Sequence, residues 1–170
     1  MRSIIGFAAA AALGLTGVAS LAHAENVRKS FDQWEAACLD TKDGKRACAL
    51  AMALVNQKKA IVLQWLISPG PDKKGNSMSI STLTGVLVGN GISVRFGDSE
   101  PVRIPYKLCM PKFCAAEIPF SDSWLKTFKA SKGFSVTITA ANGKEIKYDV
   151  SLSKFSDAYD FYSAEVAKTK

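Results

Sequence analysis

Two Ser-x-x-Lys pairs have the residue types and the spacing of a serine nucleophile beside a lysine base: Ser123–Lys126 and Ser151–Lys154. Penicillin-interacting serine enzymes combine this motif with Ser-Asp-Asn and Lys-Thr-Gly elements, neither of which occurs in the sequence. Serine and lysine are so common in this chain that chance alone accounts for two such pairs. We therefore interpret both pairs as chance matches and not as a catalytic site.

Acidic residues are the next candidates, because two carboxyl groups at the right separation can hydrolyse a glycosidic bond. That separation depends on the fold, and no sequence context around these residues marks an acid or a nucleophile. We expect them to lie on the solvated surface, which makes a carboxylate-based hydrolase the weakest functional hypothesis. The candidates are Glu35, Asp98, Glu100, Glu117 and Asp122.

The first 24 residues have the pattern of a cleaved signal peptide. Arg2 provides a positive start, residues 4–18 an apolar stretch and residues 22–24 an Ala-x-Ala site, so cleavage is predicted between Ala24 and Glu25. The apolar stretch is short and lacks basic residues directly after it, which argues against a membrane anchor. We therefore expect an exported mature chain, residues 25–170, that forms a single domain in the periplasm, at the outer membrane or outside the cell.

Removal of this segment would take away His23, the only histidine of the sequence. A mature chain without histidine cannot use Ser-His-Asp or Cys-His catalysis, and it cannot build a zinc site that needs imidazole. The sequence also has no P-loop, no dinucleotide fingerprint and no EF-hand loop, so neither a cofactor nor a metal is expected. These absences favour a protein that is not an enzyme.

The chain is basic, with a formal net charge of +7 over 170 residues, but its lysines and arginines are spread along the sequence. No basic stripe with interleaved aromatic residues occurs, so nucleic acid is not an expected partner. Outside the cytoplasm, a basic surface suits anionic lipid head groups, polysaccharide or an acidic protein. No second hydrophobic stretch long enough to span a membrane follows residue 24, so the mature chain is expected to lack a transmembrane segment.

The sequence holds four cysteines: Cys38, Cys48, Cys109 and Cys114. An even number in an exported chain indicates disulfides, and four cysteines permit three pairings. We predict the local pairing, Cys38–Cys48 with Cys109–Cys114, because a turn at Asp43-Gly44 would place the first two opposite each other and Pro111 tightens the second loop. Each bridge is expected to stabilise the fold by about 2–3 kcal/mol. A four-thiolate zinc site or a thioredoxin-type site would need Cys-x-x-Cys spacing, which is absent.

Alternation of apolar and polar residues predicts most of the strands. Residues 46–55 alternate alanines with larger apolar residues, and we interpret them as a strand although Ala, Leu and Met favour helices. Residues 60–67 are apolar at nearly every position, which suits a central strand covered on both faces. Asn142-Gly143 predicts the turn of a hairpin between the last two runs. The remaining alternating runs are residues 92–96, 102–106, 134–140 and 146–152.

The C-terminal residues predict an amphipathic helix that docks on the core, because four large apolar side chains recur there at helical spacing. Acidic residues occupy the predicted polar face, and their charge argues against binding to anionic lipid. The apolar stripe is Phe155, Tyr159, Tyr162 and Val166, and the acidic residues are Asp157, Asp160 and Glu165.

One short internal helix and one loop complete the predicted elements. Ser121-Asp122 can cap a helix over residues 123–130. Residues 68–77 have the composition of an exposed loop. Short strands, frequent turns and disulfides in an exported chain predict a mainly β protein, with an antiparallel β-sandwich, the internal helix and the C-terminal helix.

Several short motifs follow one another along the chain. They are Phe31-Asp-Gln-Trp34 with Cys38, Arg46-Ala-Cys48-Ala-Leu50, Gly91-Ile-Ser-Val94, Ile104-Pro-Tyr106, Cys109-x4-Cys114-Ala115 and Val150-Ser-Leu-Ser-Lys-Phe155-x2-Ala158. Their order and the cysteine spacing resemble the invasion-associated locus B family of exported bacterial proteins. Two departures from the family pattern are Lys154, where a glycine is expected before Phe155, and residues 68–77, which replace a Leu/Pro-rich link.

The resemblance implies an immunoglobulin-like β-sandwich that is periplasmic or secreted, in a family with virulence-associated members that promote host-cell entry. It implies no active site. The leading hypothesis is therefore a non-enzymatic binding protein whose partner is an envelope protein, a host-surface protein or the anionic envelope surface. Exposed loops such as residues 68–77 are the expected contacts.

The alternative hypothesis is a carrier of a small apolar or lipid ligand. Such a ligand would lie between the sheets or under the C-terminal helix, in a pocket lined by aromatic side chains. Core packing accounts for the same side chains equally well. The candidates are Trp65, Trp124, Phe128 and Tyr159.

Overall fold

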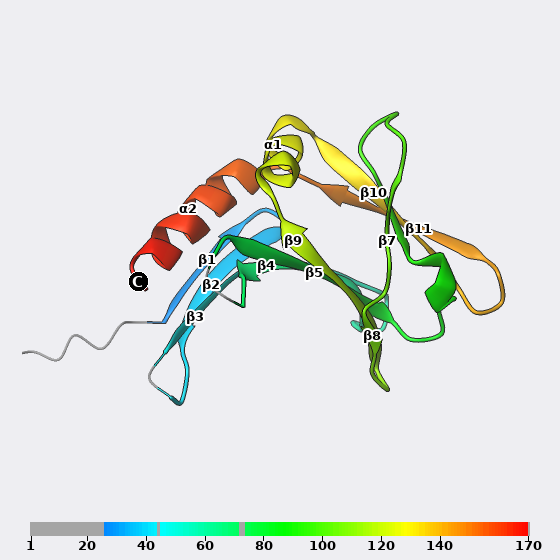
Figure 1. The fold of residues 1–170 in the computed structure, drawn as a ribbon, viewed down its shortest axis with the longest axis horizontal. Helices are drawn as coiled ribbons and strands as arrows, with labels where there is room; N and C mark the ends of the chain where they lie inside the picture. Colours follow the sequence, from blue (N-terminus) through cyan, green and yellow to red (C-terminus); the bar gives the residue numbers. More distant parts are fainter. Residues whose placement is uncertain (1–25, 44, 72–73, 170) are drawn as a thin grey trace, which may run out of the picture.

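The computed structural model describes residues 26–43, 45–71 and 74–169, which form two antiparallel sheets and two α-helices (Figure 1). In spatial order, the large sheet consists of β1 (Val27–Phe31), β2 (Trp34–Asp40), β3 (Arg46–Val55), β4 (Ile61–Pro69), β5 (Asn76–Leu83), β9 (Phe113–Phe120) and β8 (Leu108–Cys109). The small sheet consists of β11 (Glu145–Ser151), β10 (Gly133–Thr139), β6 (Ile92–Arg95) and β7 (Val102–Ile104). The helices are α1 (Asp122–Ala130) and α2 (Phe155–Ala167), and a 3-10 turn, η1 (Val88–Asn90), precedes β6. The mainly β sandwich with an internal and a C-terminal helix is thereby confirmed.

The predicted signal peptide, residues 1–24, and the cleavage site between Ala24 and Glu25 lie outside the described residues. Gly44 of the predicted Asp43-Gly44 turn lies outside them as well.

The large sheet begins as a meander, because β1 to β5 are neighbours both in sequence and in space. β9 then pairs with β5, and the short β8 pairs with β9 at the edge. In the small sheet, β10 pairs with β6 although β7, β8, β9 and α1 separate them in the sequence. The small sheet is therefore assembled from segments that are distant in the chain.

β3 follows the predicted alternation. Cys48, Leu50 and Met52 are buried, while the alanines between them face the opposite side of the sheet. Their pairing with β2 and β4 overrides the helix-forming tendency of Ala, Leu and Met, because a strand buries one side of this pattern and a helix would not.

β4 lies at the centre of the large sheet, between β3 and β5, as predicted. The prediction that both of its faces are covered is wrong. Leu63, Trp65 and Ile67 are fully buried, but Val62, Gln64 and Leu66 on the other face are only partly buried. Helix α2 and the small sheet both cover the inner side of the large sheet, so the outer side of β4 stays partly open to solvent. The run of apolar residues in β4 was therefore not a sign of two covered faces.

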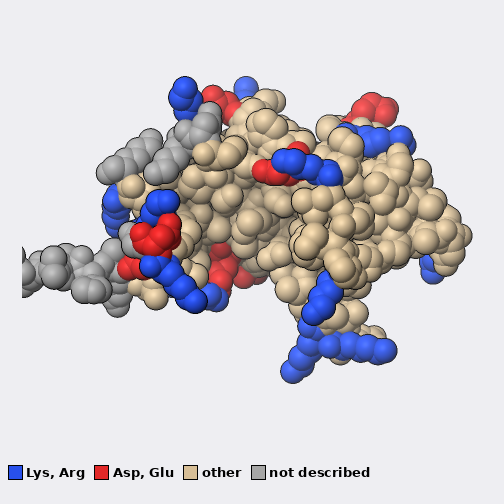
Figure 2. Space-filling view, turned by 60° about the horizontal axis from the view of Figure 1, so that its bottom comes forward, with Lys and Arg blue, Asp and Glu red and all other residues tan. Residues whose placement is uncertain are grey.

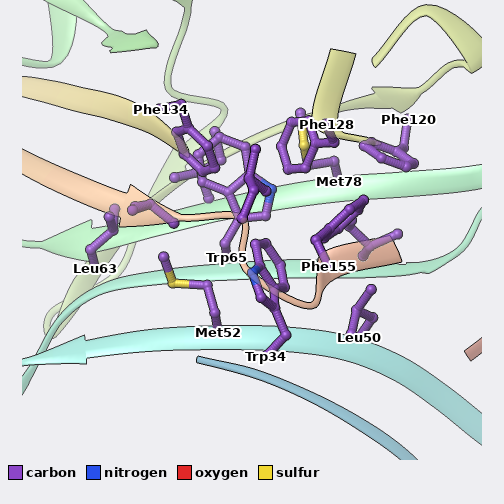
Figure 3. Close-up of a cluster of buried hydrophobic side chains, with 14 of the residues drawn as sticks. Trp34, Leu50, Met52, Leu63, Trp65, Met78, Phe120, Phe128, Phe134 and Phe155 are labelled. Carbon is purple, nitrogen blue, oxygen red and sulfur yellow. The ribbon is translucent and has the colours of Figure 1, made fainter. Parts of the chain in front are cut away.

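The core lies between the two sheets and is rich in aromatic rings (Figure 3). Phe128 of α1 is at its centre, with its ring centroid 5.8 Å from Trp65, 5.3 Å from Phe134 of the small sheet and 5.0 Å from Phe155 of α2. Trp34 completes the cluster, 4.9 Å from Phe155. One ring of the short internal helix thus connects both sheets and the C-terminal helix.

The outer face of the large sheet, turned away from α2, carries mostly small uncharged side chains. Alternate residues of β3 and β5, such as Ala49, Ala51, Ser79 and Ser81, lie on it. Figure 2 shows this side as a broad uncharged surface with charged side chains in small separate groups. Two ion pairs belong to strands near the edges of this sheet, Arg28–Glu35 and Lys107–Glu117.

Helix α1 begins at Asp122, one residue before the predicted start, and Ser121 caps it: the Ser121 hydroxyl accepts a hydrogen bond from the backbone N–H of Trp124. Helix α2 lies across β1, β2 and β3 on the inner side of the large sheet (Figure 1). Phe155 and Tyr162 are buried, which confirms the predicted docking. Neither helix of the described chain is long and apolar enough to cross a membrane.

The polar face predicted for α2 is wrong at Glu165. Its side chain is only 8% exposed, and it forms an ion pair with Arg46, whose Nη2 lies 3.5 Å from Glu165 Oε2. Arg46 also contacts Asp40, and Lys168 contacts Glu165 from the solvent side. The sequence contained no sign of the arginine on β3 that makes this burial possible.

Residues 68–77 do not form one exposed loop. Ser68 and Pro69 belong to β4, Asn76 and Ser77 belong to β5, and the two pairs lie opposite each other in the sheet. The Asn76 side chain faces α2, where its Nδ2 donates to the Tyr159 hydroxyl at 3.0 Å and its Oδ1 accepts from the Tyr162 hydroxyl at 2.9 Å. A polar residue that the composition assigned to a loop therefore holds the C-terminal helix on the sheet.

Both cysteine pairs of the local pairing are joined in the structure. Cys38 of β2 and Cys48 of β3 are direct cross-strand partners, and so are Cys109 of β8 and Cys114 of β9. Each bridge therefore connects two strands that already pair through their backbones.

Candidate functional site

A hollow of about 430 Å³ lies on the outer face of the small sheet. Its middle is one row of four cross-strand partners: Lys147 pairs with Thr137, Thr137 with Ser93, and Ser93 with Arg103. Arg95 lies in the next row, opposite Ser135. We call this feature the basic hollow, defined by Arg95, Arg103 and Lys147 with the hydroxyl residues Ser93, Ser135, Thr137 and Thr139.

The alternation of the strands produces this composition. Ile92 and Val94 of β6, like Val136 and Ile138 of β10, point into the core and are buried. Because successive side chains of a strand point to opposite faces, the polar residues between them must point outward. The alternation that buries the apolar residues of β6 and β10 therefore also places their serines and threonines on the outer face, where they form the floor of the basic hollow.

Gly91 shapes one end of the basic hollow. Its φ of +65° is a conformation that side-chain-bearing residues rarely adopt, and a Cβ there would lie 2.7 Å from the carbonyl oxygen of Ile104. The glycine thus lets the start of β6 approach β7 closely. At the same end, Asn90 Nδ2 donates a hydrogen bond to Thr139 Oγ1 at 3.1 Å.

The arginines in the described part of the chain fall into two groups. Arg28 and Arg46 form ion pairs with carboxylates on neighbouring elements. Arg95 and Arg103, both exposed, have no ion-pair partner among the described residues. Arg95 and Arg103 are diagonal neighbours on β6 and β7, and in an antiparallel pair the backbone positions of such neighbours are about 7–8 Å apart. Their positive charges therefore repel each other.

Two acidic residues lie close to these cations. Glu145 lines the basic hollow, and Asp149 lies 3.5 Å from Lys147 Nζ. Both partners of the Lys147–Asp149 pair are largely exposed, so the pair is weak and leaves the lysine able to bind another anion. The lining keeps an excess of positive charge.

The basic hollow can bind an anion and can donate or accept hydrogen bonds. Its side chains include no cysteine, histidine or carboxylate pair. In residues 26–43, 45–71 and 74–169, no group of three or more His, Cys, Asp or Glu side chains is placed to hold a metal ion.

The Ser-x-x-Lys pairs are not arranged as nucleophile and base. Ser123 and Lys126 lie exposed on α1. Lys154 forms an ion pair with Asp157, 3.2 Å away, while the Ser151 hydroxyl accepts a hydrogen bond from the Ser153 backbone N–H. Neither lysine is buried, so neither has the desolvated environment that makes a lysine a base.

The acidic candidates are dispersed. Glu35 on β2 and Glu117 on β9 are separated by four strand-to-strand steps, about 19 Å, which exceeds the separation of the carboxylate pair in a glycosidase. Hydrogen bonds from Lys107 and Ser77 hold the pKa of Glu117 below its usual value, the opposite of what a general acid requires. Asp98 and Glu100 lie exposed in the turn between β6 and β7, and Asp122 lies exposed at the start of α1.

The four aromatic residues considered for an apolar ligand pack against one another and against the core. Trp65 and Phe128 are buried, with ring centroids 5.8 Å apart, and Trp124 lies 6.0 Å from Phe128. Tyr159 packs 5.9 Å from Phe155 and accepts a hydrogen bond from Asn76. Trp65 and Phe128 therefore belong to the core, and Trp124 and Tyr159 are partly buried against it.

The cations of the basic hollow were not predicted as a site from the sequence. Arg95, Arg103 and Lys147 each occupied a polar position of a predicted strand, so their outward direction was available. What was lacking was the order of strands in the small sheet, where β6, β7, β10 and β11 meet from distant parts of the chain. No local pattern specifies that order.

Comparisons with known proteins agree with this fold. The family model described as Invasion associated locus B (IalB) protein matches residues 34–162. Invasion protein B of Bartonella bacilliformis is 26% identical over 140 residues, which covers 79% of this chain and 74% of that protein. The crystal structure of invasion associated protein b from Bartonella henselae matches with a TM-score of 0.69 at 19% identity, over 83% of this chain and 99% of that one.

Proposed function

We propose that this chain, which belongs to the invasion-associated locus B family, is an exported binding protein of the bacterial envelope and has no enzyme activity. Cleavage between Ala24 and Glu25 would release residues 25–170 as one mature domain. The mature protein would act in the periplasm, at the outer membrane or outside the cell. Its partner would be a component of the envelope or of a host surface.

The basic hollow is the observation that carries this proposal. Two exposed arginines that form no ion pair with any residue the structure describes lie there beside a lysine and a floor of hydroxyl groups. Side chains that remain unpaired on a folded surface are available to a second molecule, and convergent cations attract an anionic one. The two disulfides suit a protein that works in an oxidising compartment.

The absence of enzyme activity is supported by the positions of the candidate catalytic groups. Lys154 and Glu117 are held in ion pairs, and Ser123, Lys126, Asp98, Glu100 and Asp122 are exposed to solvent. The name of the matched relative describes an invasion protein, and a role of this chain in invasion would follow from binding at the basic hollow.

In-cell crosslinking followed by capture of the chain tests the proposal. Three forms would be compared: the native chain, the double variant R95E/R103E, and the double variant K112E/K126E. The last pair carries the same change of charge at exposed lysines outside the basic hollow. We expect the native chain and K112E/K126E to capture the same envelope component and R95E/R103E to lose it.

Two results would contradict the proposal. Retention of the full-length chain in the cytoplasm would contradict export. Capture of the same component by R95E/R103E at the native level would show that the basic hollow is not the binding surface.

A further inference from the structure

We infer that the basic hollow binds an acidic polysaccharide, a chain of sugars that carries carboxylate groups at intervals. This inference rests on the proposed binding function and specifies the chemistry of the ligand. Three features of the basic hollow point to it: the spacing of its positive charges, the composition of its floor and the nature of its walls.

The positive charges are spread along a line. Lys147 and Arg103 occupy the two ends of one row of cross-strand partners. Three strand-to-strand steps separate their backbone positions, a distance of about 14 Å. Arg95 lies beside Arg103 in the next row. A single phosphate or sulfate ion could contact both ends only if both long side chains bent toward the middle of the row. A polymer with separate anionic groups can contact them together.

The floor between the charges consists of short hydroxyl side chains. Ser93 of β6 and Thr137 of β10 lie between Arg103 and Lys147. Ser135 and Thr139, also on β10, lie in the rows on either side. Each hydroxyl can donate one hydrogen bond and accept two. Sugar hydroxyl groups have the same capacity, so a sugar chain laid across the strands can satisfy the floor along its whole length.

The walls argue against other anionic ligands. Pro101 is the one side chain of the lining without a polar group, apart from Gly91, which has no side chain. A lipid needs apolar surface for its acyl chains, and single-stranded nucleic acid needs aromatic rings on which its bases stack. Tight protein partners depend on aromatic or large apolar anchors, which are absent from this lining too.

Bound carboxylates would also relieve the repulsion between Arg95 and Arg103. Arginine suits this task because its planar guanidinium donates two parallel hydrogen bonds to a carboxylate. Glu145 at the rim and Asp149 beside Lys147 oppose the ligand's charge, so the two arginines are expected to contribute most of the attraction.

Isothermal titration calorimetry of the mature protein with alginate oligosaccharides, which consist of uronates, tests this inference. Dextran is the neutral control, and inorganic phosphate and a single-stranded DNA oligonucleotide are the other anions. We expect binding of alginate that weakens with added salt, and none of dextran or phosphate. Loss of each arginine should weaken alginate binding about tenfold, so R95E/R103E should bind about 100-fold more weakly, and K112E/K126E about as well as the native chain.

Nuclear magnetic resonance of the native protein provides a second measurement that depends on no variant. Alginate should shift the backbone signals of Ser93 and Thr137, and it should leave those of Ala51 and Ser79 on the outer face of the large sheet unchanged.

Several outcomes would overturn the inference. Equal weakening in R95E/R103E and K112E/K126E would indicate nonspecific attraction to a basic protein. Equal affinity for DNA and alginate would indicate a general polyanion surface. If alginate does not bind but in-cell capture still depends on Arg95 and Arg103, the ligand class is wrong and the proposed function stands. If neither depends on these arginines, both are wrong.

Discussion

Asn76 is expected to contribute more to stability than its position at the start of a strand indicates. Its side chain hydrogen-bonds two tyrosines of α2: Nδ2 donates to Tyr159 at 3.0 Å, and Oδ1 accepts from Tyr162 at 2.9 Å. Tyr162 is 1% exposed, so water cannot replace the lost acceptor. The substitution Asn76→Ala would therefore leave a buried hydroxyl without a partner.

The magnitude follows from these two contacts. A buried polar group without a partner costs about 1–3 kcal/mol, and the second hydrogen bond contributes about 0.5–1.5 kcal/mol. We expect Asn76→Ala to lower the free energy of unfolding by about 2–3 kcal/mol. Asn90→Ala is the matched control, because Asn90 also donates one side-chain hydrogen bond, to Thr139, but at an exposed position. It should cost less than about 1 kcal/mol.

Urea unfolding of the mature protein with intact disulfides would measure both effects. The variant Tyr162→Phe and the double variant N76A/Y162F complete a double-mutant cycle. Because the double variant leaves no buried hydroxyl without a partner at position 162, its loss should be smaller than the sum of the single losses by about 1 kcal/mol. Equal losses in Asn76→Ala and Asn90→Ala, or strict additivity in the cycle, would refute the assigned role of Asn76.

Three further predictions concern the backbone and pH. Lys154 has a φ of +59°, which favours glycine, so Lys154→Gly should raise urea stability by about 0.5–1 kcal/mol, and a decrease would contradict the strain. Gly91→Ala should lower the free energy of unfolding by more than about 1 kcal/mol, because the new Cβ meets the Ile104 carbonyl oxygen. Gly89→Ala is the control and should lower it less, because the space around Gly89 is open. Equal losses in the two variants would show that the contact with Ile104 is not the cause. Burial raises the pKa of Tyr162 above its ordinary 10.0, so the neutral hydroxyl stabilises the fold below pH 10 and this contribution is lost as the pH rises further. The Tyr162→Phe variant should therefore lose less stability above pH 10 than the native chain. An identical dependence of urea stability on pH in the two proteins would contradict this prediction.

The fold was predictable where one local pattern decided between a buried and an exposed face. Residues 46–55 appear in the structure as β3 with the predicted bounds, and the stripe through Phe155 and Tyr162 forms the docked face of α2. In each case the choice of face depended on the period of the apolar residues alone. The pairing of Cys38 with Cys48 was equally local, because both lie on strands joined by one turn.

The errors concern polar residues whose partners are distant in sequence. Glu165 is buried because Arg46 on β3 reaches it, and Asn76 is ordered because two tyrosines of α2 hydrogen-bond to it. From its local sequence alone, a charged or amide side chain is predicted to be exposed to solvent. It can be buried only where another part of the fold supplies a hydrogen-bond or ion-pair partner. Lys154 is the converse case, because the left-handed backbone explains why a glycine was expected there.

The basic hollow was hidden for the same reason. Arg95, Arg103 and Lys147 are unremarkable as single outward-facing residues of three strands. They become a site only through the pairing of β10 with β6, which brings distant segments together. The orientation of each side chain was predictable, but their convergence was not.

Site-specific crosslinking in living cells can show whether the outer face of the small sheet is the binding surface. A photoreactive diazirine amino acid would be placed at Thr137, in the floor of the basic hollow, and in a second strain at Ala53, exposed on the outer face of the large sheet. We expect light-dependent attachment of an envelope or surface component from position 137 and none from position 53. Attachment from position 53 alone would place the binding surface on the uncharged face of the large sheet and would rule out the basic hollow.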